Sequence, residues 1–81
     1  MKTLTVQLFA RYAELLGAPQ VEIPAEGIAT VGDLLARLRT LPGGDAIGGA
    51  TLVAVNLRQA RADAPVSPKD EIALLPPLAG G

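Results

Sequence analysis

The sequence contains neither cysteine nor histidine, and these absences exclude several kinds of chemistry. Without them there is no disulfide framework, and a zinc site lacks its usual ligands. A serine hydrolase lacks its usual base, and Ser67, the only serine, lies in a Ser-Pro-Lys-Asp sequence typical of a turn. No GxGxxG or Walker A pattern occurs. We therefore expect a chain that is not catalytic alone and that binds no metal or cofactor.

Aromatic residues and excess charge are also scarce. Phe9 and Tyr12 are the only aromatic residues, and seven basic against eight acidic residues give a net charge of −1. Nucleic-acid binding requires a basic face that neutralises phosphates. No apolar run approaches the length of a membrane span, and the first residues alternate without a signal-peptide core. We expect no nucleic-acid or membrane partner and a cytoplasmic location, with which the absence of cysteine is compatible.

Aliphatic residues dominate what is present. Hydrophobic residues make up 49% of the 81 residues, which is enough for one small folded domain with an aliphatic core. A core of this size is marginal alone, so a frequent partner would stabilise it. We assign residues 1–75 to the domain and residues 76–81 to a flexible C-terminal tail that ends in Gly-Gly.

Local patterns predict an α+β fold. Strands are expected over residues 2–9, 21–23, 52–56, 58–61 and 71–75, and a short helix over residues 10–16 that ends at Gly17. Leu4, Val6 and Leu8 share one face of the first strand. With one main helix across one face, the sheet is mixed and four- to five-stranded, accompanied by one or two short helices.

The main helix has the clearest local signals. Thr30 is its expected N-cap, and Asp33 at the third position completes a capping box. Its apolar stripe continues to Leu41, and Pro42-Gly43-Gly44 is the expected stop. Arg37 and Arg39 are interpreted as a solvated helix face. Gly43-Gly44 and Gly48-Gly49 indicate a mobile loop rather than a phosphate cradle. The carboxylate pair Asp70-Glu71 is interpreted as a solvated strand entry, since neighbours in a strand point to opposite faces.

The C-terminus resembles an arm that carries the terminal carboxylate away from the folded body. Pro76 and Pro77 lack a backbone N–H, so they end the last strand and stiffen the base of the arm. Gly80 and Gly81 have no Cβ and can enter a channel that is too narrow for other residues. The alternative interpretation is a disordered terminus that has no function.

Three blocks of the sequence resemble the molybdopterin synthase small subunit. They are residues 8–17 (LFARYAELLG), 53–56 (VAVN) and 69–81 (KDEIALLPPLAGG), and they keep the order found in that family. The resemblance implies a ubiquitin-like β-grasp fold and a sulfur-carrier function. A ubiquitin-activating-type adenylyltransferase uses ATP to adenylate the terminal glycine, and a sulfur donor protein converts it to a thiocarboxylate. Sulfur then passes to cyclic pyranopterin monophosphate and forms the molybdopterin dithiolene.

The resemblance also assigns roles to residues. Gly81 is adenylated and then bears the sulfur, and Gly80 is the spacer that lets it pass. The implied partner is the large subunit, in a heterotetramer. Its expected contacts are made by Phe9, Leu75, Pro76, Pro77, Leu78 and Ala79.

The strand pattern bears on two of these contacts. Alternation in the last strand places Leu74 and Leu75 on opposite faces. We expect Leu75 to face the partner with Phe9 nearby, although Phe9 is equally compatible with the core. The family often has aromatic residues where this chain has Leu74 and Leu75.

Three alternatives stay open. A thiazole-pathway sulfur carrier uses the same chemistry, but resembles a shorter chain without the helix after the first strand and without the double proline. A ubiquitin-like protein modifier would join Gly81 to lysines of other proteins. A non-catalytic β-grasp interaction domain would keep its partner binding after Gly81 is deleted.

Overall fold

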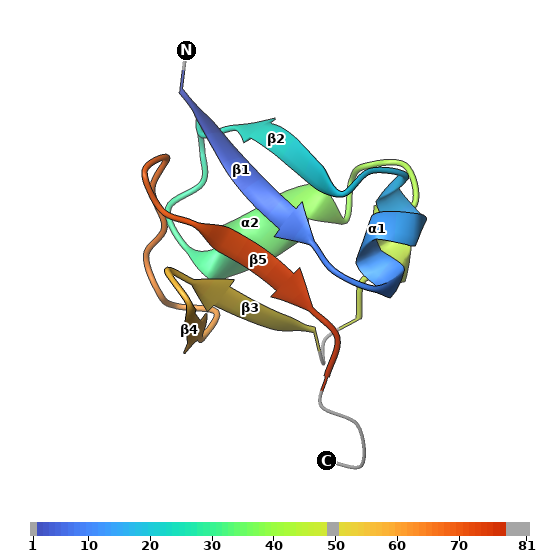
Figure 1. Cartoon of the computed structure of the whole chain (residues 1–81). Helices are drawn as coiled ribbons and strands as arrows, with labels where there is room; N and C mark the ends of the chain where they lie inside the picture. Colours follow the sequence, from blue (N-terminus) through green and yellow to red (C-terminus); the bar gives the residue numbers. More distant parts are fainter. Residues whose placement is uncertain (1, 49–50, 78–81) are drawn as a thin grey trace.

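The computed structural model describes residues 2–48 and 51–77, which contain a five-stranded mixed sheet. Its strands are β1 (Thr3–Leu8), β2 (Gln20–Pro24), β3 (Leu52–Val55), β4 (Arg58–Ala60) and β5 (Ile72–Leu75). They lie in the order β2-β1-β5-β3-β4, with β1 and β5 parallel and the other neighbours antiparallel. The helix α2 (Val31–Leu38) crosses one face of the sheet, and the short helix α1 (Arg11–Leu16) lies beyond the end of β1 (Figure 1). This is the predicted β-grasp architecture.

The core lies between the sheet and α2 and is almost entirely aliphatic. Alternation in β1 buries Leu4, Val6 and Leu8, as predicted, and alternation in β5 buries Ile72 and Leu74. The complete set of buried hydrophobic residues is Leu4, Val6, Leu8, Tyr12, Ile23, Val31, Leu34, Leu38, Ile47, Val53, Val66, Ile72 and Leu74. Burial of these side chains is the main favourable contribution to folding.

The single buried aromatic residue, Tyr12, anchors α1. Its ring is buried, and its hydroxyl shares a hydrogen bond of 2.8 Å with Oγ1 of Thr51. This bond satisfies the polar end of a side chain that otherwise packs among aliphatic residues. The helix ends at Leu16, and Gly17 after it adopts φ 76°, so the predicted glycine cap is confirmed.

A capping box starts α2, as predicted. Oγ1 of Thr30 accepts a hydrogen bond from the Asp33 N–H at 3.2 Å, and the Asp33 carboxylate accepts one from the Thr30 N–H at 3.1 Å. The carboxylate also accepts from the Ala29 N–H at 3.0 Å. These bonds, above all the one from Ala29, lower the pKa of Asp33 because they favour the charged form.

The end of α2 differs from the prediction. The helix ends at Leu38, before the expected stop at Pro42-Gly43-Gly44, and Leu41 packs against the core from the following turn. Arg39 does not belong to a purely solvated face, because its Nε donates to the Ile47 carbonyl at 3.0 Å. The segment also contains the 3₁₀ turn η1 (Gly44–Ala46). Residues 43–48 therefore form a turn in which Gly44 and Ile47 are buried, while the expected mobility stays a prediction and Gly49 lies outside the described residues.

Close packing explains one glycine of this turn. A Cβ added to Gly44 would overlap the backbone carbonyl oxygen of Leu38 at the end of α2. We expect Gly44→Ala to lower the free energy of unfolding by about 2 kcal/mol or more, because backbone cannot move aside as a flexible side chain can. Urea denaturation measures this change.

Gly48 provides the matched control, because nothing lies within 4 Å of the position of its added Cβ. Gly48→Ala is expected to stay within about 0.5 kcal/mol of the wild type. Equal unfolding midpoints for the two variants would contradict the close approach at Gly44.

Candidate functional site

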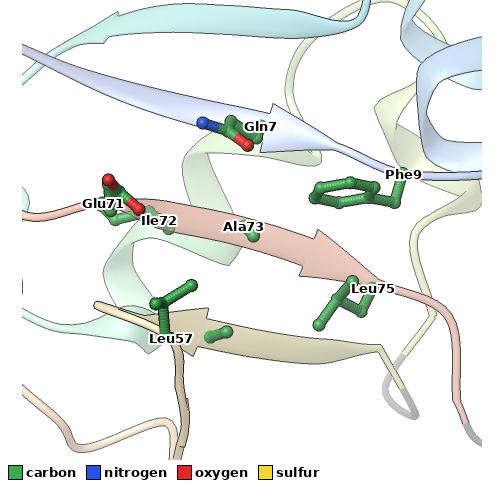
Figure 2. A pocket seen from close by; sticks show the side chains of 8 residues that line it. Gln7, Phe9, Leu57, Glu71, Ile72, Ala73 and Leu75 are labelled. Atoms are coloured by element: carbon green, nitrogen blue, oxygen red, sulfur yellow. The ribbon is translucent and has the colours of Figure 1, made fainter.

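A hollow of about 240 Å³ lies on the sheet and is the candidate site. Outward-facing residues of β1, β3 and β5 provide half of its lining, so it opens on the face of the sheet away from α2 (Figures 1 and 2). We call it the sheet hollow. It is lined by Gln7, Phe9, Ala54, Leu57, Glu71, Ile72, Ala73 and Leu75.

Strand register explains why the sheet is hollow here. Ala73 of β5 lies between Gln7 of β1 and Ala54 of β3 in the register of neighbouring strands. The two alanines form a low floor because their side chains end at Cβ. Larger side chains stand at both ends: Phe9 and Leu75 at the end where β5 finishes, and Leu57 with Glu71 at the other (Figure 2).

The structure brings Phe9 and Leu75 together, as the sequence predicted. The Phe9 N–H donates to the Leu74 carbonyl at 3.2 Å, so the pairing of β1 with β5 continues one residue beyond β1. The Phe9 side chain is 44% exposed, and the alternative that placed it in the core is therefore wrong. Both side chains line the sheet hollow, while their role as partner contacts stays a prediction.

Sequence reasoning missed Leu57, which is the most exposed large apolar residue described. It follows Asn56 in the turn between β3 and β4. The φ of Asn56 is 54° and the φ of Leu57 is 69°. Two residues with positive φ are typical of the tightest hairpin turns. The predicted turn at Asn56 is confirmed, and a leucine directly after such a turn residue was the available signal.

Asn56 also ties this turn to the start of β5 through a set of hydrogen bonds, which we call the Asn56 clasp. Its N–H donates to the Glu71 carbonyl at 2.7 Å, and its side-chain oxygen accepts from the Glu71 N–H at 2.9 Å. Its Nδ2 donates to Asp70 at 3.0 Å, and the same carboxylate accepts from the Ser67 N–H at 2.8 Å. The bond from Asn56 is the largest cause of the lowered pKa of Asp70.

The predicted tail residues are only partly described. β5 ends at Leu75, directly before Pro76 and Pro77, so the expected end of the strand is confirmed. The predicted positions Leu78, Ala79, Gly80 and Gly81 lie outside the described residues. The part of the tail that bears the expected chemistry is therefore known from the sequence alone.

The described residues offer little for other kinds of site. In residues 2–48 and 51–77, no group of three acidic, histidine or cysteine residues is placed to hold a metal ion. None of the helices in this part of the chain is long and apolar enough to cross a bilayer. In the acidic pair, the Asp70 carboxylate takes part in the Asn56 clasp, and Glu71 lines the sheet hollow.

The chain is similar to one known protein family and to several solved structures. The model of the ThiS family matches residues 6–81. The crystal structure of SAMP1 from Haloferax volcanii is 31% identical, covers 98% of this chain and 99% of its own, and superposes with a TM-score of 0.78. A complex of subunits 1 and 2 of molybdopterin-converting factor from Helicobacter pylori matches at 25% identity over 98% of this chain and 99% of that one, with a TM-score of 0.68.

A third structure supports the fold alone. A putative molybdopterin converting factor subunit 1 from Pyrococcus furiosus is 24% identical over 96% of this chain and 100% of its own, with a TM-score of 0.79.

The Asn56 clasp predicts how stability depends on acidity. The pKa of Asp70 is lower in the folded chain than the ordinary value of 3.8, so the unfolded chain binds more protons in acid. The stabilisation is therefore present above pH 3.8 and is lost as the pH falls through the folded pKa. Asp33 contributes in the same direction. We expect Asp70→Asn to be less stable than the wild type at neutral pH and to lose less stability on acidification.

Urea midpoints at neutral pH and at about pH 3 measure this difference. Asp63→Asn is the control, because Asp63 is exposed and lies outside the clasp. The urea midpoint of this control should equal that of the wild type at both pH values. A steeper loss in Asp70→Asn than in the wild type would contradict the assignment.

Proposed function

The chain belongs to the ThiS family of β-grasp sulfur carriers, and on that premise we propose that it is the small subunit of a molybdopterin synthase. One observation carries the proposal. β5 forms part of the floor of the sheet hollow and lies in the middle of the sheet (Figure 1). In the sequence it is followed at once by Pro76 and Pro77, and the chain then ends in Gly80-Gly81. A protein that binds the hollow is therefore well placed to receive the tail.

The proposed chemistry begins at the carboxylate of Gly81. A carboxylate is a poor electrophile, so an activating enzyme joins it to AMP from ATP and releases pyrophosphate. Sulfide supplied by the donor protein then attacks the carbonyl carbon and AMP leaves, which produces the thiocarboxylate without a change in oxidation state. In the large subunit the thiocarboxylate sulfur is the nucleophile toward cyclic pyranopterin monophosphate. The sulfur takes the place of an oxygen substituent of the pterin, and hydrolysis of the acyl–sulfur bond returns the Gly81 carboxylate. Each charged chain gives one sulfur atom, so the dithiolene requires two of them.

The folded part of the chain serves to position this group. Phe9 and Leu75 are the proposed apolar contacts of the large subunit, and Pro76 with Pro77 sets the direction in which the tail leaves. Leu78 and Ala79 then line the channel, and Gly80 allows Gly81 to reach the pterin. The Helicobacter pylori match is a complex of two subunits, which supports a large-subunit partner for this chain.

A second candidate is a ubiquitin-like modifier. The Haloferax volcanii match at 31% identity is SAMP1. A second crystal structure, at 29% identity, is of the small archaeal modifier protein 1 of the same organism. A modifier would share the activation of Gly81, but a lysine amine would attack the activated carbonyl and form an isopeptide bond. The two functions therefore differ in the acceptor and not in the first step.

Intact mass spectrometry tests the proposed function. The purified chain is incubated with ATP, the activating enzyme of its host and a sulfur donor. We expect a mass increase that corresponds to one oxygen replaced by sulfur, because the terminal carboxylate becomes a thiocarboxylate. A variant that lacks Gly81 should show no increase. Adding the large subunit and cyclic pyranopterin monophosphate should then return the mass to its starting value and form molybdopterin.

The other outcomes separate the candidates. Adducts of the chain on lysines, without pterin conversion, would favour the modifier. No mass change, with an activating enzyme shown to be active on another carrier, would contradict a sulfur carrier of the molybdopterin or the thiazole pathway.

A further inference from the structure

We propose that Leu57 is a partner-binding residue, and that the sheet hollow it closes accepts one large apolar side chain of the large subunit. The inference rests on the proposed function, since it describes how that partner docks. It adds a residue that neither the sequence pattern nor the resemblance indicated. Glu71 stands at the same end of the hollow, and we infer that a basic residue of the partner faces it.

The first argument is that Leu57 is unfavourable for the isolated chain. It is 89% exposed, so its apolar surface gains almost nothing from folding. Its φ of 69° is a conformation that bulky side chains rarely adopt and that glycine adopts without strain. A glycine would therefore suit the turn better on both counts. A residue held against both preferences beside a hollow is a candidate for function.

The second argument is that the residue before Leu57 is tied to the start of β5 by hydrogen bonds. The Asn56 clasp joins the preceding residue to Glu71 by two hydrogen bonds of 2.7 and 2.9 Å and to Asp70 by one of 3.0 Å. The turn is therefore fixed to the strand that forms the floor of the hollow. A side chain presented from a fixed backbone loses less entropy on binding, which favours a contact residue over an incidental one.

The third argument concerns the size and lining of the sheet hollow. Its volume of about 240 Å³ lies below the roughly 300–1,000 Å³ of small-molecule sites. The floor of Ala54 and Ala73 and the walls of Phe9, Leu75 and Leu57 are apolar. Such a pocket suits a single anchoring side chain at the centre of an interface. β5 continues from this floor into the tail, so a partner that holds the tail also covers the hollow.

The charge at the rim of the sheet hollow supports a basic residue of the partner, next to the apolar side chain that enters the hollow. Glu71 is exposed, and no hydrogen bond from the described residues reaches its carboxylate, although its backbone N–H is bound to Asn56. A lysine or arginine of the partner would pair with this carboxylate on closure, and such complementarity favours the correct partner over others.

The decisive variant is Leu57→Gly, because stability and binding should change in opposite directions. We expect a higher urea midpoint, since glycine relieves the positive φ. We expect the Kd for the purified large subunit of the same organism, measured by calorimetry, to rise about tenfold or more. A general weakening of the fold cannot produce this pair of results.

A second variant tests the hollow itself. Ala54→Leu adds bulk to the floor and is also expected to raise the Kd about tenfold or more, because the partner side chain no longer fits. Ala36→Leu is the matched control, since Ala36 is exposed on α2, which covers the other face of the sheet. Its Kd should equal that of the wild type.

The outcomes separate this inference from the proposed function. If the wild type forms the thiocarboxylate and binds the large subunit, but Leu57→Gly and Ala54→Leu bind equally well, the inference is overturned and the function stands. If the wild type neither forms the thiocarboxylate nor binds the large subunit, the inference and the proposed function are both overturned. Self-association of the wild type that Leu57→Gly abolishes, with unchanged large-subunit binding, would identify a second copy as the occupant and also overturn the inference.

Discussion

The parallel pairing of β1 with β5 is the interaction on which the rest of the structure depends. It joins the two ends of the chain, with Leu8 opposite Leu74 and Gln7 opposite Ala73. The same register places Leu74 in the core and Ala73 in the floor of the sheet hollow. A slip of one residue would exchange the two faces of β5 and remove the core and the hollow together. The core and the proposed docking surface thus depend on one register.

Polar groups act at the edges of this aliphatic structure. No buried polar or charged residue is found in the described ranges, and no buried side-chain nitrogen or oxygen there lacks a hydrogen bond. The capping box fixes the start of α2, and the Asn56 clasp fixes the start of β5. Both use an aspartate whose pKa is lowered by bonds to its charged form. This division suits a carrier, because its reactive group is a terminal carboxylate and its body only has to position it.

The sequence predicted what depends on local pattern and missed what depends on contacts. Alternation located β1 and β5 correctly, and the Thr30–Asp33 spacing located the start of α2, since period and capping are local properties. The early end of α2 and the packed turn at Gly44 were not predicted. At these positions Arg39 donates to the Ile47 carbonyl and Gly44 packs against the Leu38 backbone, and local sequence patterns do not reveal such contacts. For the site, alternation predicted that Phe9 and Leu75 share a surface. It gave no role to Leu57, whose position depends on the fold of a turn.

Specificity in such a carrier must reside in the folded surface rather than in the reactive end. A terminal Gly-Gly presents only backbone to an acceptor, so it cannot distinguish a pterin-binding subunit from a lysine of another protein. Discrimination between acceptors is a difference in binding free energy, and side chains have to supply it. In the described part of the chain, the sheet hollow has the required properties: an apolar floor, a rim tied to β5 by the Asn56 clasp, and one acidic group beside the strand that leads into the tail. On the proposed function, the choice of acceptor falls to this surface, which has Leu57 at one end and Phe9 with Leu75 at the other.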